Sequence, residues 1–176
     1  MPVIQRPLKL PSRSARAQAE SKELWNEARS AATADFFTIG YSGRTLPELL
    51  ARLARVNVRS LIDIRFSPVS MYRPELSKNN LQRLVERSGF QYLHMPSLGV
   101  PRHVRAKAIE TGTRNVIWKW YEVSVIKPFL RQNLHKFLNF AEHPVALMCV
   151  EMDPQECHRH LLFQALEDRG LQGFDL

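Results

Sequence analysis

The sequence predicts a single α/β domain, a three-layer, Rossmann-like arrangement in which helices flank a mostly parallel sheet of four or five strands. Two observations lead to this prediction. From residue 35 onward, short apolar runs alternate with amphipathic helical stretches, a pattern typical of parallel sheets that are covered on both faces. The length of 176 residues suits one such domain, with a core large enough to be stable without disulfide bonds.

The composition is that of a soluble globular protein, with 44% hydrophobic and 24% charged residues. No apolar run is long enough to span a bilayer and no signal-peptide core is visible, so no membrane partner is predicted. Two cysteines are too few for a disulfide framework. Both thiols are therefore expected to be free, in the reducing cytoplasm.

The net charge of +8 favours anionic partners, either nucleic acid or a phosphate-bearing small molecule. The charge is densest around "PRHVRAK" (101–107), with Arg114 and Lys119 nearby in the sequence. A solvated basic surface without a specific partner is the alternative interpretation, and charge alone does not reject it.

Residues 1–34 are predicted to be an N-terminal leader and a short helix, partly flexible, and residues 35–176 to be the α/β domain. The leader (1–18) contains three prolines, four basic residues and no acidic residue. The prolines disfavour the amphipathic helix of an organelle presequence. The short helix (19–33) would pack through Leu24, Trp25 and Ala28.

The first half of the domain contains three predicted strands separated by two helices. The strands are the apolar runs at 36–41, 59–66 and 90–96. Within 45–56, leucines recur at helical spacing on one face, and Thr45 followed by Glu48 forms a capping box. Ser77 is placed to cap a second helix over 78–88, which Gly89 ends.

The second half begins with a long, mostly helical stretch over 101–142, in which Pro128 is expected to start a new helix. A fourth strand follows at 144–151. Asp153, Pro154 and Glu156 then match the N-cap, N1 and N3 positions of the last helix, which Gly170 ends. Residues 171–176 are a candidate edge strand.

Polar residues collect where the predicted strands end. In parallel sheets, ligands bind outside the carboxyl ends of the strands, and residues two apart in a strand face the same side. The polar residues at these ends are Tyr41, Ser42, Asp63, Arg65, Tyr92, His94, Cys149 and Glu151. The glycines of "GYSG" (40–43), just before a helix, could also present amides to a phosphate.

Ordinary structural roles are open for most of these residues. Asp63 and Arg65 could form an ion pair that holds a loop, and Tyr92 and Cys149 could be core residues. Glu151 differs, because a carboxylate that ends a buried strand needs a partner, which Arg65 or Arg159 could provide.

The turn before the last helix carries a second group of reactive residues. On a helical wheel, His158 begins the buried stripe of this helix, with Cys157 and Arg159 about 100° to either side. A helix N-terminus lowers the pKa of a thiol. Cys157 is thus placed as a reactive thiolate, His158 as an acid or base and Arg159 as an anion ligand. A packed thiol, a core histidine and a solvated arginine are the alternatives.

Several classes of site do not fit the spacing of these residues. Cys149, Cys157, His158 and His160 do not match a zinc-knuckle or zinc-ribbon pattern, so no metal and no cofactor is predicted. The Cys-x5-Arg loop of cysteine-dependent phosphatases is absent. No serine nucleophile elbow and no Walker loop are present either.

The segments "TIGYSGRTLPELL", "LIDIRFSP", "YLHMPSLG" and above all "CVEMDPQECHRHLL" resemble the bacterial and archaeal family named domain of unknown function 488, from about Thr38 to the C-terminus. The resemblance implies a compact α/β domain and shared polar residues, but no reaction. Two departures bear on a substrate lid. Gly99 is followed by Val100 where the family commonly has paired glycines, and 115–130 replaces its usual Tyr-rich helix.

The leading functional hypothesis is an enzyme that binds a phosphate-bearing substrate, a nucleotide or nucleic-acid component, at the carboxyl edge. The predicted catalytic residues are Cys149, Glu151, Cys157 and His158, and the predicted substrate- or anion-binding residues are Tyr41, Ser42, Asp63, Arg65, His94 and Arg159. Here Glu151 and His158 would move protons, and Cys157 would be the nucleophile or redox centre.

Two other functions remain open. One is a non-catalytic nucleic-acid-binding module that uses the basic residues of 101–119 and stacks bases on Trp118, Trp120 and Tyr121. The other is a structural or interaction subunit whose leader folds on a partner. The oligomeric state is not predicted.

Overall fold

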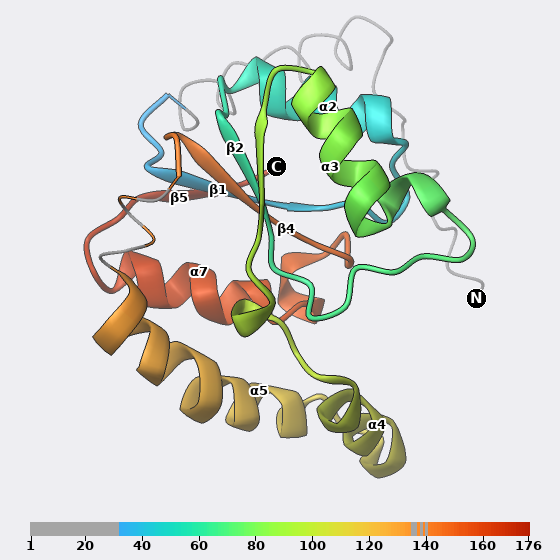
Figure 1. Cartoon of the computed structure of the whole chain (residues 1–176). Coiled ribbons are helices and arrows are strands. Elements are labelled where there is room, and N and C mark those ends of the chain that lie inside the picture. The colour runs from blue at the N-terminus through green and yellow to red at the C-terminus, as the bar shows by residue number, and fades with distance from the viewer. Residues whose placement is uncertain (1–31, 135–136, 138, 140) are drawn as a thin grey trace, which may run out of the picture. The chain divides into compact units, whose positions relative to one another are not determined.

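A parallel sheet of five strands organises the computed structural model, which describes residues 32–134, 137, 139 and 141–176 (Figure 1). The strands are β1 (Phe36–Gly40), β2 (Ser60–Asp63), β3 (Gln91–His94), β4 (Val145–Cys149) and β5 (Gly173–Asp175). Their order is β3-β2-β4-β1-β5, and every pair is parallel. The predicted α/β class is confirmed, and the candidate edge strand is β5.

The sheet and its helices belong to one unit, residues 34–176. The predicted leader, and all but the last two residues of the predicted short helix, lie outside the described residues. The central strands β1, β2 and β4 are buried along their whole length. This burial explains why they read as nearly continuous apolar runs, since both faces of a parallel sheet are covered.

Two helices, α2 (Leu46–Arg55) and α3 (Lys78–Arg87), lie on one side of the sheet (Figure 1). The predicted capping box of α2 is confirmed, since Thr45 and Glu48 exchange side-chain and backbone hydrogen bonds. Ser77 is the N-cap residue of α3, but its hydroxyl donates to the Ser70 carbonyl instead of capping. Short 3-10 turns, η1 (Pro74–Leu76) and η2 (Pro96–Leu98), follow β2 and β3.

The other side of the sheet carries α7 (Arg159–Glu167), with α5 (Asn115–Tyr121) and α4 (Arg102–Thr111) beyond it (Figure 1). After α5 the chain forms two π-helical segments, η3 (Glu122–Ile126) and η4 (Phe129–Asn133). Pro128 lies in the continuous helical residues between them and is the N-cap residue of η4. The π-helical turns on both sides accommodate the missing N–H donor of this proline.

The start of the last helix differs from the prediction. Asp153 does accept a hydrogen bond from the Gln155 amide, but Pro154–Glu156 form only a 3-10 turn, η5. Cys157 then adopts an extended conformation, and α7 begins at Arg159 with His158 as its N-cap residue. Because Cys157 is not helical, the wheel angles predicted for it and its neighbours do not apply.

No helix in the described part of the chain combines the length and the apolar content that crossing a membrane requires.

Candidate functional site

The structure separates the predicted site residues into two groups on opposite faces of the sheet. Asp63 lies in register with Met148 of β4 and with His94 of β3. Side chains alternate along a strand, so Asp63 and His94 point away from the face to which Cys149 points. The pairs of residues at the strand ends therefore do not converge on one point.

The first group is a buried ion pair between Asp63 and Arg65. The arginine donates from Nε to Asp63 Oδ1 at 2.8 Å and from Nη2 to Oδ2 at 2.6 Å, and the side chains are 0% and 4% exposed. The hydroxyl of Tyr92 donates to Asp63 Oδ2 at 2.7 Å. Burial, together with the Asp63 charge, raises the pKa of Tyr92 well above its usual range. This network satisfies both charges internally.

Tyr41 and His94 surround this ion pair. The Arg65 guanidinium lies 5.2 Å from the centre of the Tyr41 ring, and His94 Nε2 lies 2.9 Å from the Arg65 carbonyl oxygen. The amides of Tyr41 and Ser42 donate to the carbonyls of Cys149 and Val150. These two N–H groups, which the sequence predicted could bind a phosphate, therefore already donate to the backbone.

The second group brings Cys149, Cys157 and His158 together on the α7 side of the sheet. Their side chains are 1%, 1% and 5% exposed. Cys149 Sγ and Cys157 Sγ lie 3.9 and 4.0 Å from His158 Nδ1, and the Cys149 thiol donates to Glu151 Oε2 at 3.5 Å. The Tyr121 ring packs on the imidazole at 4.9 Å. Residues from α5, from the end of β4 and from the turn before α7 thus form one cluster.

The electrostatics of the cluster distinguish its two thiols. Burial acts to raise the pKa of Cys157, but hydrogen bonds from Cys149 and His158 and the charge of His158 lower it below its usual value. The hydrogen bond to Cys157, followed by burial, raises the pKa of Cys149. Burial and the Cys157 charge also raise the pKa of Glu151. These directions favour ionisation of Cys157 over ionisation of Cys149.

The backbone at Glu151 is held from two sides. The guanidinium of Arg159, which is 1% exposed, donates to the carbonyls of Glu151 and Met152. On the other side, the Glu151 carbonyl packs against Gly40, where a Cβ atom would lie only 1.7 Å from that oxygen. Arg159 thus positions the loop, and its charge is directed at the loop carbonyls and at Asp175, 3.8 Å away.

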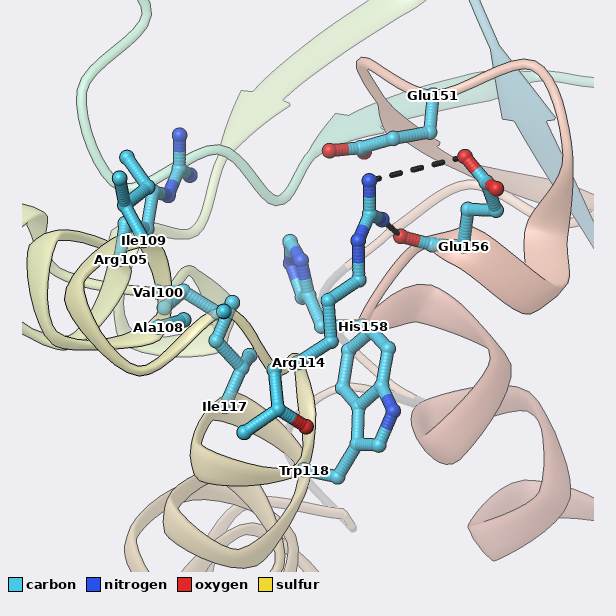
Figure 2. Close-up of a pocket in the computed structure, with 12 residues that line it drawn as sticks. Val100, Arg105, Ala108, Ile109, Arg114, Ile117, Trp118, Glu151, Glu156 and His158 are labelled. Carbon is cyan, nitrogen blue, oxygen red and sulfur yellow. Dashed lines mark hydrogen bonds and ion pairs between the residues drawn. The ribbon is translucent and has the colours of Figure 1, made fainter.

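A cavity of about 350 Å³ opens beside the second group (Figure 2). Its lining residues come from the segment around α4 and α5, from the end of β4 and from the turn before α7: Val100, Arg105, Ala108, Ile109, Gly112, Thr113, Arg114, Ile117, Trp118, Glu151, Glu156 and His158. Of the predicted catalytic residues, Glu151 and His158 line it, whereas Cys149 and Cys157 do not. Arg65 and Arg159 are not among its lining residues.

Arg114, Glu151 and Glu156 lie near one another on one side of the cavity, and Arg105 lies on the opposite side (Figure 2). Arg114 and Glu156 form an ion pair at 3.6 Å, with side chains that are 49% and 65% exposed. Glu151 lies close to this pair in the view, and Arg105 reaches the cavity from α4. The basic segment 101–107 and Arg114 were visible in the sequence, but no periodic signal placed them against the end of β4.

Comparison with known proteins gives one match. A family model described as "Domain of unknown function DUF488" matches residues 45–166, which extend from the start of α2 to near the end of α7. No curated protein and no solved structure matches the chain.

Proposed function

Because the chain belongs to the family described as domain of unknown function DUF488, which names no reaction, we propose a function from the cavity itself. The protein is an enzyme that binds a phosphate-bearing, nucleotide-like substrate in this cavity, and Glu151 transfers a proton there. The observation that carries the proposal is that one cavity is lined by two carboxylates, an imidazole and two guanidinium groups.

The walls of the cavity suit a ligand with an apolar, flat part and an anionic part. Val100, Ala108, Ile109 and Ile117 supply apolar surface, and Trp118 supplies an aromatic ring for a base. The volume of about 350 Å³ falls in the range of small-molecule sites, roughly 300–1,000 Å³. A nucleotide combines these two parts in one molecule.

Arg105 and Arg114 are the groups that would hold the phosphate. Guanidinium groups bind phosphate oxygens in a bidentate way, which gives both strength and orientation. Arg114 donates to the Glu156 backbone carbonyl and also pairs with the exposed Glu156 carboxylate, and exposed ion pairs are weak. A phosphate can therefore compete with Glu156 for this arginine.

Glu151 is the candidate proton-transfer group because its carboxylate lines the cavity and its backbone is fixed by Arg159 and Gly40. A catalytic acid or base has to be within hydrogen-bond reach of the substrate in a defined position. The thiol of Cys157 is 1% exposed and does not line the cavity, so we do not assign it the attack on the substrate.

The nucleic-acid-binding alternative has less support from the aromatic residues. The Tyr121 side chain is fully buried, and its hydroxyl donates to the Leu98 carbonyl at 2.7 Å. Trp120 is partly buried against the core. Of the three aromatics considered for base stacking, Trp118 alone lines the cavity, which favours one bound base over an extended strand. The interaction-subunit alternative depends on the leader, outside the described residues.

The proposal predicts that nucleotides raise the thermal denaturation temperature of the protein, and that Arg114→Ala or Arg105→Ala weakens their binding by roughly tenfold or more. Loss of one charge-assisted contact costs about 1.5–3 kcal/mol. A screen of mono- and dinucleotides at low salt, followed by calorimetry, measures both effects. Arg87→Ala, an exposed arginine in α3 on the other side of the sheet, removes the same charge and should leave the affinity unchanged.

Two results would contradict the proposal. One is a screen in which no phosphate-bearing compound stabilises the protein. The other is equal weakening by Arg87→Ala, since this would show that binding follows net charge and not the cavity. Steep salt dependence with long oligonucleotides and no effect of mononucleotides would instead support the nucleic-acid-binding module.

A further inference from the structure

We propose that Cys149, Cys157 and His158 form a binding site for one zinc-like divalent cation at the floor of the cavity. The three ligand atoms lie within 4.8 Å of one another, and all three residues are buried. Metal binding by this cluster does not depend on the nucleotide proposal. The use of the ion in a reaction does rest on that proposal.

The distances fit a tetrahedral site. With Zn–S bonds of about 2.3 Å and Zn–N bonds of about 2.0 Å, a sulfur and a nitrogen ligand lie about 3.6 Å apart. The observed distances to His158 Nδ1 are 3.9 Å from Cys149 Sγ and 4.0 Å from Cys157 Sγ. Nδ1 is thus within reach of both sulfurs. The two sulfurs lie within 4.8 Å of each other, against about 3.8 Å in an ideal tetrahedral site.

The donor types fit a zinc-like ion better than they fit a hard cation. Thiolate and imidazole are the ligands of zinc, whereas magnesium and calcium take oxygen ligands. Two thiolates would also neutralise a divalent cation, so that the buried site would carry no net charge. The distances of 3.9 and 4.0 Å between His158 Nδ1 and the two sulfurs are long for direct hydrogen bonds. A single cation between the three groups would instead contact all of them at once.

The surroundings hold these ligands in place. Cys149 ends the buried strand β4, and Cys157 lies in the turn between η5 and α7. The Tyr121 ring packs on the imidazole of His158. Such outer contacts orient metal ligands. The spacing in the sequence does not reveal the site, because Cys157 and His158 reach Cys149 only through the non-helical turn before α7.

Three protein ligands leave one tetrahedral position open, as in catalytic zinc sites. Glu151 marks the side on which it would lie, since its Oε2 is 3.5 Å from Cys149 Sγ and its side chain also lines the cavity. A water bound there would lie within reach of the Glu151 carboxylate, which would accept its proton. Two cysteines, one histidine and a non-ligand glutamate are also the groups that zinc deaminases use on nucleobases.

Metal analysis of the full-length protein, purified without chelators, tests the site. We expect close to one zinc per chain, and a loss of at least nine-tenths of it in Cys149→Ser, Cys157→Ser and His158→Asn. His103→Asn, an exposed histidine of α4, is the matched control and should keep its metal. A chain without metal, a disulfide between the two cysteines in the native protein, or equal metal loss in His103→Asn overturns the proposal.

A second measurement uses only the wild-type chain, so it does not depend on whether the variants fold. Protein stripped with a chelator should bind one equivalent of Zn²⁺, melt at a higher temperature with it, and react with iodoacetamide at least tenfold more slowly. No uptake of Zn²⁺ by the stripped, folded protein overturns the site. Nucleotide binding by Arg105 and Arg114 variants is a separate measurement, so each proposal can fail without the other.

Discussion

Gly40→Ala is expected to lower the free energy of unfolding by about 3 kcal/mol or more. A Cβ atom at this position would lie 1.7 Å from the Glu151 carbonyl oxygen and 2.6 Å from its carbonyl carbon. Both are backbone atoms, so no rotation of a side chain relieves the contact. The end of β1 and the loop at 151–152 would have to separate, which also breaks the fixed position of Glu151.

Denaturant unfolding of Gly40→Ala and of Ser42→Ala measures this effect. Ser42 lies in the same connection and is half-buried, so removing its hydroxyl should cost less than about 1 kcal/mol. If Gly40→Ala were as stable as Ser42→Ala, the close approach between β1 and Glu151 would be incorrect. The folded fraction of Gly40→Ala should also bind nucleotides more weakly than the wild type.

Asp63→Ala is expected to destabilise the protein by about 3–5 kcal/mol. The substitution leaves the buried Arg65 guanidinium without its carboxylate and the Tyr92 hydroxyl without its acceptor. The cost comes mainly from the uncompensated buried charge. Combining Asp63→Ala with Arg65→Met, which removes that charge, should therefore recover part of the loss.

Unfolding of these variants can be compared with that of Glu75→Ala, which removes a half-exposed ion pair with Arg73 on the same side of the sheet. Exposed pairs contribute little, so this control should change stability far less. A loss of stability in Asp63→Ala as small as that in Glu75→Ala would contradict this account. It would mean that Arg65 contacts water or another partner and that the ion pair is not fully buried.

Much of the fold could be predicted because local signals and the global arrangement agree. The apolar runs, the capping box at Thr45 and the short final strand each have a physical reason that the sequence displays. The start of α7 was predicted too early. Asp153 and Pro154 have the chemistry of a helix start, but the extended conformation of Cys157 interrupts the chain after one 3-10 turn.

The site was harder to predict because strand register is a tertiary property. The rule that residues two apart share a side groups Asp63 with Arg65 and Cys149 with Glu151, but it does not say which face of the sheet each pair occupies. The register of Asp63 with Met148 puts these pairs on opposite faces. The sequence also shows Arg105 and Arg114 only as part of a basic segment, since their place in the same cavity as Glu151 depends on how α4 and α5 pack.

Occlusion of the cavity tests the proposed ligand site most directly. Thr113 is exposed and lines the cavity, whereas the exposed Thr111 of α4 does not, so a tryptophan at each position gives a matched pair of variants. Calorimetry with the most stabilising nucleotide should show binding at least about tenfold weaker in Thr113→Trp and wild-type binding in Thr111→Trp. Equal affinity in Thr113→Trp and the wild type would contradict a nucleotide site in this cavity.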